Sequence, residues 1–226
     1  MSASFHAARP SRAAMNTKRI RVAVFGSFYR GYYVLDELLH GPLKELFTVV
    51  GVATDDVAQP FISRDLRVWQ YPHRPWEETM VERRAQAHGV PVYKGRVKHD
   101  TFYQLFEQEW TPDLCVSATF GQRIDARLFN FPKLGFFNIH PCMDDGWPSK
   151  YAGPNPFQAL MDDGQDHTKA ALHRVDEGFD TGELIAMSAR VAMPPDATVV
   201  DMHKITSPVI ARFAVGELAK LAKVTA

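Results

Sequence analysis

Short apolar runs alternate with segments of helical composition along most of this 226-residue chain, and this alternation restricts the fold more than any other feature. The apolar runs are bounded by turn residues, and each is long enough for a buried strand. Parallel strands joined by helices are the arrangement that such an alternation predicts. We therefore expect an α/β fold, with a doubly wound, mostly parallel sheet and helices on both of its faces, in a single domain of residues 18–226.

The predicted strands share apolar and β-branched residues. They cover residues 18–25, 48–54, 90–93, 113–118, 134–139, 170–175 and 183–191. The predicted helices cover residues 32–39, 76–88 and 100–110, and residues 199–223 form one long helix or two. Residues 55–75 are the least regular stretch, with Pro60, Pro72 and Pro75, and form either a loop on the substrate side or an ordinary surface excursion.

Residues 1–17 differ in amino-acid composition from the rest of the chain. They contain Arg9 and Arg12, small residues and no acidic residue. A transit peptide has a similar composition, but there is no apolar stretch of signal-peptide length. We expect a disordered leader, or an upstream start codon with Met15 as the natural start.

Two polar side chains stand at the end of the strand predicted over residues 134–139. Asn138 and His140 are two positions apart, so in extended chain they point to the same face. Pro141 cannot donate to a sheet ladder, and the strand is expected to stop there. An amide donor would then lie beside an imidazole at the carboxyl end of a strand, where open α/β sheets bind ligands. The alternative is a polar pair that caps a strand end.

Three motifs in this chain follow the order found in a known enzyme family. They read Asn-Ile-His-Pro over residues 138–141, Phe-Gly-Gln-Arg-Ile over 120–124, and Val-Asp-Glu-Gly-Phe-Asp-Thr-Gly over 175–182. Together they resemble the 10-formyltetrahydrofolate-dependent formyltransferases, which include glycinamide ribonucleotide, methionyl-tRNA, amino-sugar and siderophore formyltransferases. The resemblance is dense over residues 113–185 and extends in pattern from residue 18 to the C-terminus.

The resemblance implies three catalytic residues, Asn138, His140 and Asp180. In formyl transfer an amine attacks the formyl carbon, an oxyanion develops and a proton leaves the amine. Asn138 is suited to donate to the oxyanion, an effect commonly worth about 3 kcal/mol. His140 would donate a second hydrogen bond or move the proton. Asp180 would orient the imidazole and favour its cationic form, or it is only a turn residue of the Asp-Thr-Gly sequence.

The other two motifs are implied to enclose the pterin of 10-formyltetrahydrofolate, the expected formyl donor. The implied folate-binding residues are Phe120, Gly121, Gln122, Arg123, Ile124, Val175, Asp176, Glu177 and Gly178. Phe120 and Ile124 could instead be core residues under a loop. His173 resembles a histidine common at this position in the family, although a lone histidine in a strand is more often structural. No histidine or cysteine spacing indicates a metal site, and none is expected.

Two segments depart from the family pattern and bear on the formyl acceptor. Residues 26–31 carry two glycines near a helix start and could cradle a phosphate, but they lack the Gly-x-Gly of dinucleotide sites. Phe28 and Tyr29 stand where purine-pathway relatives carry small polar residues for the substrate phosphate. Residues 142–153 are longer than in relatives, and Asp144 and Asp145 within them would either receive a cationic amine or form a solvated turn.

Charge and cysteine content limit the partners and the compartment. Lysine plus arginine equals aspartate plus glutamate at 26 each, so no overall field attracts a polyanion, and nucleic acid is not an expected partner. No apolar run reaches the length of a membrane span. Cys115 and Cys142 lie in a buried-strand pattern and beside the polar pair, so no disulfide is expected and a cytoplasmic location fits.

We therefore expect transfer of a formyl group from 10-formyltetrahydrofolate to the amine or hydroxylamine nitrogen of a small molecule. A hydroxyornithine-type siderophore precursor or a nucleotide-linked amino sugar suits the altered segments better than glycinamide ribonucleotide. Methionyl-tRNA is disfavoured because those relatives carry a further C-terminal domain, and hydrolysis of formyltetrahydrofolate because those relatives carry a regulatory domain. The remaining alternative is a catalytically silent folate-binding module. The oligomeric state is not predicted.

Overall fold

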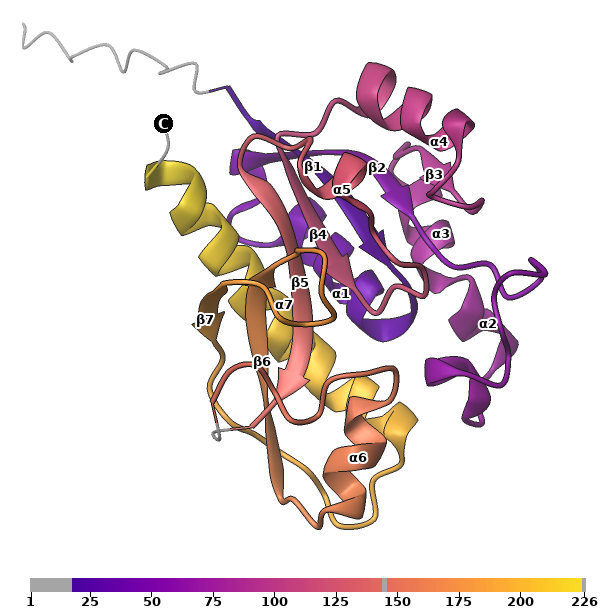
Figure 1. The fold of residues 1–226 in the computed structure, drawn as a ribbon, viewed down its shortest axis with the longest axis vertical. Helices are drawn as coiled ribbons and strands as arrows, with labels where there is room; N and C mark the ends of the chain where they lie inside the picture. Colours follow the sequence, from indigo (N-terminus) through magenta and orange to yellow (C-terminus); the bar gives the residue numbers. More distant parts are fainter. Residues whose placement is uncertain (1–17, 144–145, 225–226) are drawn as a thin grey trace, which may run out of the picture.

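The computed structural model describes residues 18–143 and 146–224 (Figure 1). The predicted leader and the pair Asp144 and Asp145 lie outside the described residues. No helix within the described ranges combines the length and the apolar character that a membrane crossing requires. Cys115 and Cys142 are both buried, and no disulfide joins them.

One sheet runs through the molecule in the strand order β3-β2-β1-β4-β5-β6-β7, with β8 paired to β6. Strands β1 to β5 pair in parallel, whereas β6 is antiparallel to β5, β7 and β8. The strands are β1 Ile20–Gly26, β2 Phe47–Ala53, β3 Val92–Tyr93, β4 Leu114–Ala118, β5 Gly135–Cys142, β6 His167–Arg174, β7 Leu184–Met187 and β8 Val191–Ala192. The expected α/β architecture with a mostly parallel sheet is confirmed.

Helices cover both faces of the parallel part of this sheet, and they pack on two separate apolar clusters (Figure 1). Helices α1, α3 and α7 pack on one face, whereas α4, η3 and α5 pack on the other. The helices are α1 Phe28–His40, α2 Pro75–Glu78, α3 Met80–Gln86, α4 Asp100–Gln104, α5 Ala126–Phe129, α6 Pro156–Asp162 and α7 Val199–Val224, with the short turns η1 Lys44–Leu46 and η2 Arg67–Gln70 and the π-helical segment η3 Leu105–Trp110. The doubly wound arrangement is therefore also confirmed.

The predicted end of the strand at Pro141 is wrong, because β5 continues to Cys142. Pairing with β4 ends at Asn138, whereas pairing with β6 continues, with Pro141 opposite Ala170. Beyond Asn138 the strand is therefore paired on one side only, and a proline is tolerated where its missing N–H would face away from a partner strand. Sequence analysis also missed α5 and α6, which are too short to show a helical period.

Close packing in the turn between β1 and α1 explains why residues 26 and 31 are both glycine. A Cβ atom on Gly31 would lie 2.5 Å from the carbonyl carbon of Gly26, so neither position leaves room for a side chain. Helix α1 begins at Phe28, earlier than predicted, and Phe28 and Tyr29 are buried in the core. The packing of this turn, rather than a phosphate, accounts for its glycine content.

Candidate functional site

A cleft of about 200 Å³ opens at the carboxyl ends of the parallel strands. Strand β1 pairs with β2 on one side and with β4 on the other, so the strand order changes direction at β1. Open α/β sheets bind ligands at such a switch point. Asn138, His140 and Asp180 all line this cleft. All of the expected folate-binding residues line it as well, with the exception of Glu177.

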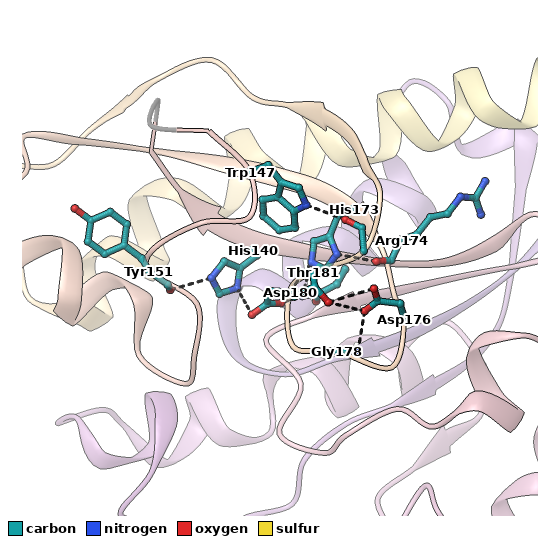
Figure 2. A network of polar contacts seen from close by, with 11 residues as sticks. His140, Trp147, Tyr151, His173, Arg174, Asp176, Gly178, Asp180 and Thr181 are labelled. Carbon is teal, nitrogen blue, oxygen red and sulfur yellow. Dashed lines mark hydrogen bonds and ion pairs between the residues drawn. The ribbon is translucent and has the colours of Figure 1, made fainter.

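Asp180 joins the two polar side chains of β5 into one cluster, and Figure 2 shows its contact with His140. Its Oδ1 accepts a hydrogen bond of 2.9 Å from Asn138 Nδ2, and its Oδ2 lies 3.2 Å from His140 Nδ1. Because Asn138 and His140 project from the same face of β5, a single carboxylate reaches both of them. The structure thus brings together the three residues expected to be catalytic, although they come from distant parts of the sequence.

His173 completes this cluster from the neighbouring strand β6, where it lies opposite Asn138. Its Nδ1 lies 2.8 Å from the carbonyl oxygen of Arg174, so Nδ1 carries the proton and Nε2 is left as an acceptor. Asn138 Nδ2 lies 3.2 Å from that Nε2 and donates to it. Both amide hydrogens of Asn138 are therefore used, and a contact to an oxyanion requires one of them to be exchanged.

His140 lies between two hydrogen-bond acceptors in a buried position. Its Nδ1 faces Asp180, and its Nε2 lies 3.0 Å from the carbonyl oxygen of Tyr151. Burial lowers the pKa of His140, and Asp180 and the Tyr151 carbonyl oppose this without overcoming it. The expectation that Asp180 favours the cationic imidazole is correct for that pair, but burial outweighs it, so the ring is neutral at neutral pH.

The loop that presents Asp180 is shaped by its own side chains. Asp180 has a φ of 52°, in the left-handed region that residues other than glycine rarely adopt. Asp176 Oδ1 accepts 3.0 Å hydrogen bonds from Gly178 N and from Thr181 Oγ1, which closes the loop around Asp180 (Figure 2). Burial raises the pKa of Asp180, but its contacts with His173, His140 and Asn138 together hold that pKa below its usual value. Asp180 is therefore an ionised, fixed acceptor rather than only a turn residue.

The segment of residues 142–153 that departs from the family pattern packs directly on the cluster. Trp147 Nε1 donates a 2.8 Å hydrogen bond to Gly182 O, and the indole lies over His173 with ring centroids 4.6 Å apart. The backbone carbonyl of Tyr151 reaches His140 (Figure 2). Contacts to the polar cluster are thus made by Trp147 and Tyr151 of this segment, while its two aspartates lie outside the described residues.

The residues expected to bind folate fall into two groups. Phe120 and Ile124 are buried in the core beside Phe25, as the core interpretation expected, and both also line the cleft, so folate binding by them stays a prediction. Gln122 bonds to the backbone of Val97 and Gly95, and it fixes the loop. Arg123 donates to the carbonyl of Glu177 and lies over the Phe179 ring, so Glu177 contributes a backbone contact outside the cleft lining.

Several cleft residues carry no recognisable sequence motif. Asp55, Arg67 and Trp69 come from the irregular stretch of residues 55–75, which therefore lies on the substrate side. Arg67 donates a 3.1 Å hydrogen bond to the Phe120 carbonyl and so ties this stretch to a predicted loop. Arg30 and His203 enter the cleft from α1 and α7. Sequence analysis indicated these positions only indirectly, through the irregular, proline-containing stretch of residues 55–75 and the glycine turn of residues 26–31, and it gave no signal for His203.

Asp55 carries a buried carboxyl group that affects stability. Burial raises the pKa of Asp55 to about 6, against the hydrogen bond from Ser27 and the charge of Arg67. The folded protein therefore keeps this proton to a higher pH than the unfolded chain, and stability falls as pH rises from about 4 through about 6. Asp55→Asn is expected to raise the free energy of unfolding at pH 7.5 by on the order of 2 kcal/mol.

Urea denaturation of both proteins at pH 7.5 and pH 4 measures this effect. Near pH 4 the carboxyl group is protonated in the folded state, so the two proteins are expected to have similar stability. A variant that is less stable than the parent at pH 7.5 would show that the ionised carboxylate stabilises the fold.

Within the part of the chain that the structure describes, no group of three or more histidine, cysteine, aspartate and glutamate side chains is arranged to hold a metal ion. The polar cluster of Asn138, His140, His173 and Asp180 is joined by hydrogen bonds and by contacts between imidazole and carboxylate. Such a cluster is suited to reactions in which an oxyanion and a mobile proton develop together.

Comparison with protein families and curated sequences gives a consistent result. The family model described as formyl transferase matches residues 18–209. A methionyl-tRNA formyltransferase of Thermus thermophilus is 31% identical over 181 residues, which are 80% of this chain and 53% of that protein. A methionyl-tRNA formyltransferase of Chloroflexus aggregans is 29% identical over 178 residues, or 79% of this chain and 52% of that protein. The chain thus spans about half the length of the curated relatives it matches.

Solved structures share the fold at lower sequence identity. A phosphoribosylglycinamide formyltransferase from Bacillus halodurans has a TM-score of 0.64 and 23% identity, over 91% of this chain and 97% of that one. A formyltetrahydrofolate deformylase from Pseudomonas syringae has a TM-score of 0.62 and 18% identity, over 90% of this chain and 63% of that one. At these identities the likeness shows that the fold is the same.

Proposed function

This chain belongs to the formyl transferase family, and we propose that it transfers a formyl group from 10-formyltetrahydrofolate to an amine or hydroxylamine nitrogen. The observation that carries this proposal is the Asp180 carboxylate, which holds both Asn138 and His140 at one end of the cleft. An amide donor, a neutral imidazole and an ionised carboxylate are the groups that acyl transfer to an amine needs.

The roles follow from the contacts of each side chain. Asn138 donates to the oxygen of the formyl group as negative charge develops there, and it exchanges one of its present partners for that contact. His140 takes up the proton that leaves the attacking amine, because its ring is neutral at neutral pH. Nε2 is the atom that accepts the proton. The resulting imidazolium then donates to both Asp180 and the Tyr151 carbonyl, so these two acceptors stabilise it. As the tetrahedral intermediate collapses, the bond between the formyl carbon and N10 of the folate breaks, and His140 passes the proton to N10, which leaves tetrahydrofolate and a neutral imidazole.

The cleft residues fit a flat, hydrogen-bonding ring such as the pterin of the donor. Phe120, Ile124 and Val175 supply apolar surface along the cleft. Asp55 Oδ1 is buried and has no hydrogen-bond partner within the protein, although Asp55 lines the same cleft. Since buried polar atoms are normally paired, this oxygen is suited to contact a polar edge of the ring.

A small-molecule amine is the proposed acceptor, with a hydroxyornithine-type precursor or a nucleotide-linked amino sugar as the expected classes. The core-packed Phe28 and Tyr29 support this choice over glycinamide ribonucleotide, since the turn that carries them is closed by the Gly26–Gly31 contact. Methionyl-tRNA is the second candidate, and it is favoured by the similarity to curated methionyl-tRNA formyltransferases.

An acceptor panel tests the proposal directly. Purified protein is incubated with 10-formyltetrahydrofolate and ornithine, hydroxyornithine, nucleotide-linked amino sugars, glycinamide ribonucleotide or methionyl-tRNA, and the products are read by mass spectrometry. We expect one amine to gain a formyl group while donor is consumed at the same rate. Donor loss that needs no amine would indicate a hydrolase instead, and tight donor binding with no loss would indicate a silent binding module.

A further inference from the structure

A buried arginine faces the cleft from the first turns of α1. Arg30 is 2% exposed and lines the cleft together with Asn138 and His140. Its Nη2 makes one long hydrogen bond of 3.4 Å to Thr206 Oγ1, and its guanidinium lies 5.3 Å from the centre of the Phe157 ring. Its Nε has no hydrogen-bond partner. Among the described residues no carboxylate lies within ion-pair distance of this cation.

A second donor lies beside it on α7. His203 is 8% exposed, lines the same cleft, and has an Nδ1 without a hydrogen-bond partner. Its ring meets the edges of Phe28 and Phe157, with centroids 5.5 and 5.0 Å apart. Burial, and then the charge of Arg30, lowers the pKa of His203 well below its usual value. The ring is therefore neutral at neutral pH and offers one N–H to a ligand.

Arg30 and His203 form an unusual pair because the buried Arg30 side chain keeps its positive charge. Burial lowers the pKa of Arg30 to about 10, so the guanidinium is still charged at neutral pH. A buried charge is unfavourable unless a group of opposite charge pairs with it. Guanidinium groups pair best with the oxygens of carboxylates and phosphates, which they meet through two parallel hydrogen bonds. The buried rings of Phe28 and Phe157, which pack against His203, lower the local polarity and would strengthen such a pair.

We propose that the formyl acceptor is an amine that also carries an oxyanion, a carboxylate or a phosphate, and that Arg30 and His203 bind this group. The inference rests on the proposed formyl transfer and specifies its substrate class. Arg30 and His140 line the same cleft of about 200 Å³. A single small molecule can therefore place its anion at Arg30 and its nitrogen at His140.

Matched pairs of amines test this assignment. Ornithine is compared with ornithinamide, and phosphoethanolamine with ethanolamine, in the parent protein and in Arg30→Met. We expect the parent to prefer the anionic member of at least one pair by about 10- to 100-fold in kcat/KM, as charge-assisted hydrogen bonds provide. Arg30→Met is expected to abolish the preference mainly by raising KM. The pair that responds distinguishes a carboxylate from a phosphate.

Two further variants make the test specific. Arg127→Met removes the same charge from α5, outside the cleft, and is expected to keep the preference. Arg30→Lys keeps the charge but lacks the planar guanidinium, so it is expected to keep part of the preference for the anionic amine. This variant also tests the site if Arg30→Met does not fold.

Other outcomes separate this inference from the proposed function. Transfer to neutral amines with no preference, or a preference that Arg30→Met leaves intact, would overturn the anion site while formyl transfer stands. If the parent formylates no amine, formyl transfer itself is overturned. Binding of inorganic phosphate and of acetate is then measured by calorimetry, and binding that Arg30→Met does not weaken overturns the anion site as well.

Discussion

Replacing His140 by alanine is expected to lower kcat by about 10²- to 10⁴-fold, the range that a positioned proton-transfer group contributes. His140 is the neutral imidazole of the cluster, and in the proposed mechanism its Nε2 accepts the proton of the attacking amine. Binding of the folate donor is expected to be retained, because the apolar wall of Phe120, Ile124 and Val175 is unchanged. Steady-state kinetics on the accepted amine and fluorescence titration with the donor measure the two effects.

His88→Ala is the matched control, since His88 is exposed and does not line the cleft. It is expected to have the kcat of the parent. A His140→Ala protein with a kcat within a few-fold of the parent would remove His140 from the mechanism. A variant that has also lost donor binding would indicate that His140 holds the cleft together rather than moving a proton.

Asp180→Asn is expected to lower the maximal rate by a similar factor and to change its pH dependence. The asparagine keeps the shape of the side chain but offers one acceptor where the carboxylate offers two, so it cannot hold both Asn138 and His140 as acceptor. An amide N–H directed at His140 Nδ1 would also force the other tautomer, with the proton on Nε2. That tautomer cannot accept the proton of the amine.

The sign of the pH effect follows from the contributions to the pKa of His140. Activity requires neutral His140, so it falls as pH decreases through a pKa that burial holds below 6.5. The negative charge of Asp180 raises the pKa of His140, so removing that charge lowers the pKa of His140 further. The acid limb of the pH–rate profile is therefore expected to move to lower pH in Asp180→Asn. It is expected to stay in place in Asp36→Asn, a control in α1 that does not line the cleft. An acid limb unchanged by Asp180→Asn would contradict the pairing.

The fold was predictable from local pattern to a large extent. The strands β1, β2, β4 and β6 and the helices α1, α3 and α7 follow from apolar runs and helical composition, which depend on neighbouring residues. The continuation of β5 through Pro141 was not predictable in this way. It depends on which side of the strand has a partner, and that is a property of the whole sheet.

The candidate site was predictable in its chemistry and not in its arrangement. Asn138 and His140 share a face because extended chain alternates, and a local pattern suffices to show it. The use of both Asn138 hydrogens by His173 and Asp180 depends on the register of β5 with β6. The contact of Tyr151 with His140 depends on how the segment after β5 folds back.

The sequence by itself determined the order of strands and helices, the residue types of the cluster and the resemblance to formyltransferases. Only the tertiary structure decided that Arg30 and His203, from two helices far apart in the chain, share the cleft with Asn138 and His140. It also decided that His140 is neutral, that Asp180 is ionised and that Arg30 keeps an unpaired charge. These properties depend on burial and on distances between charges, and both arise only when segments remote in sequence pack together.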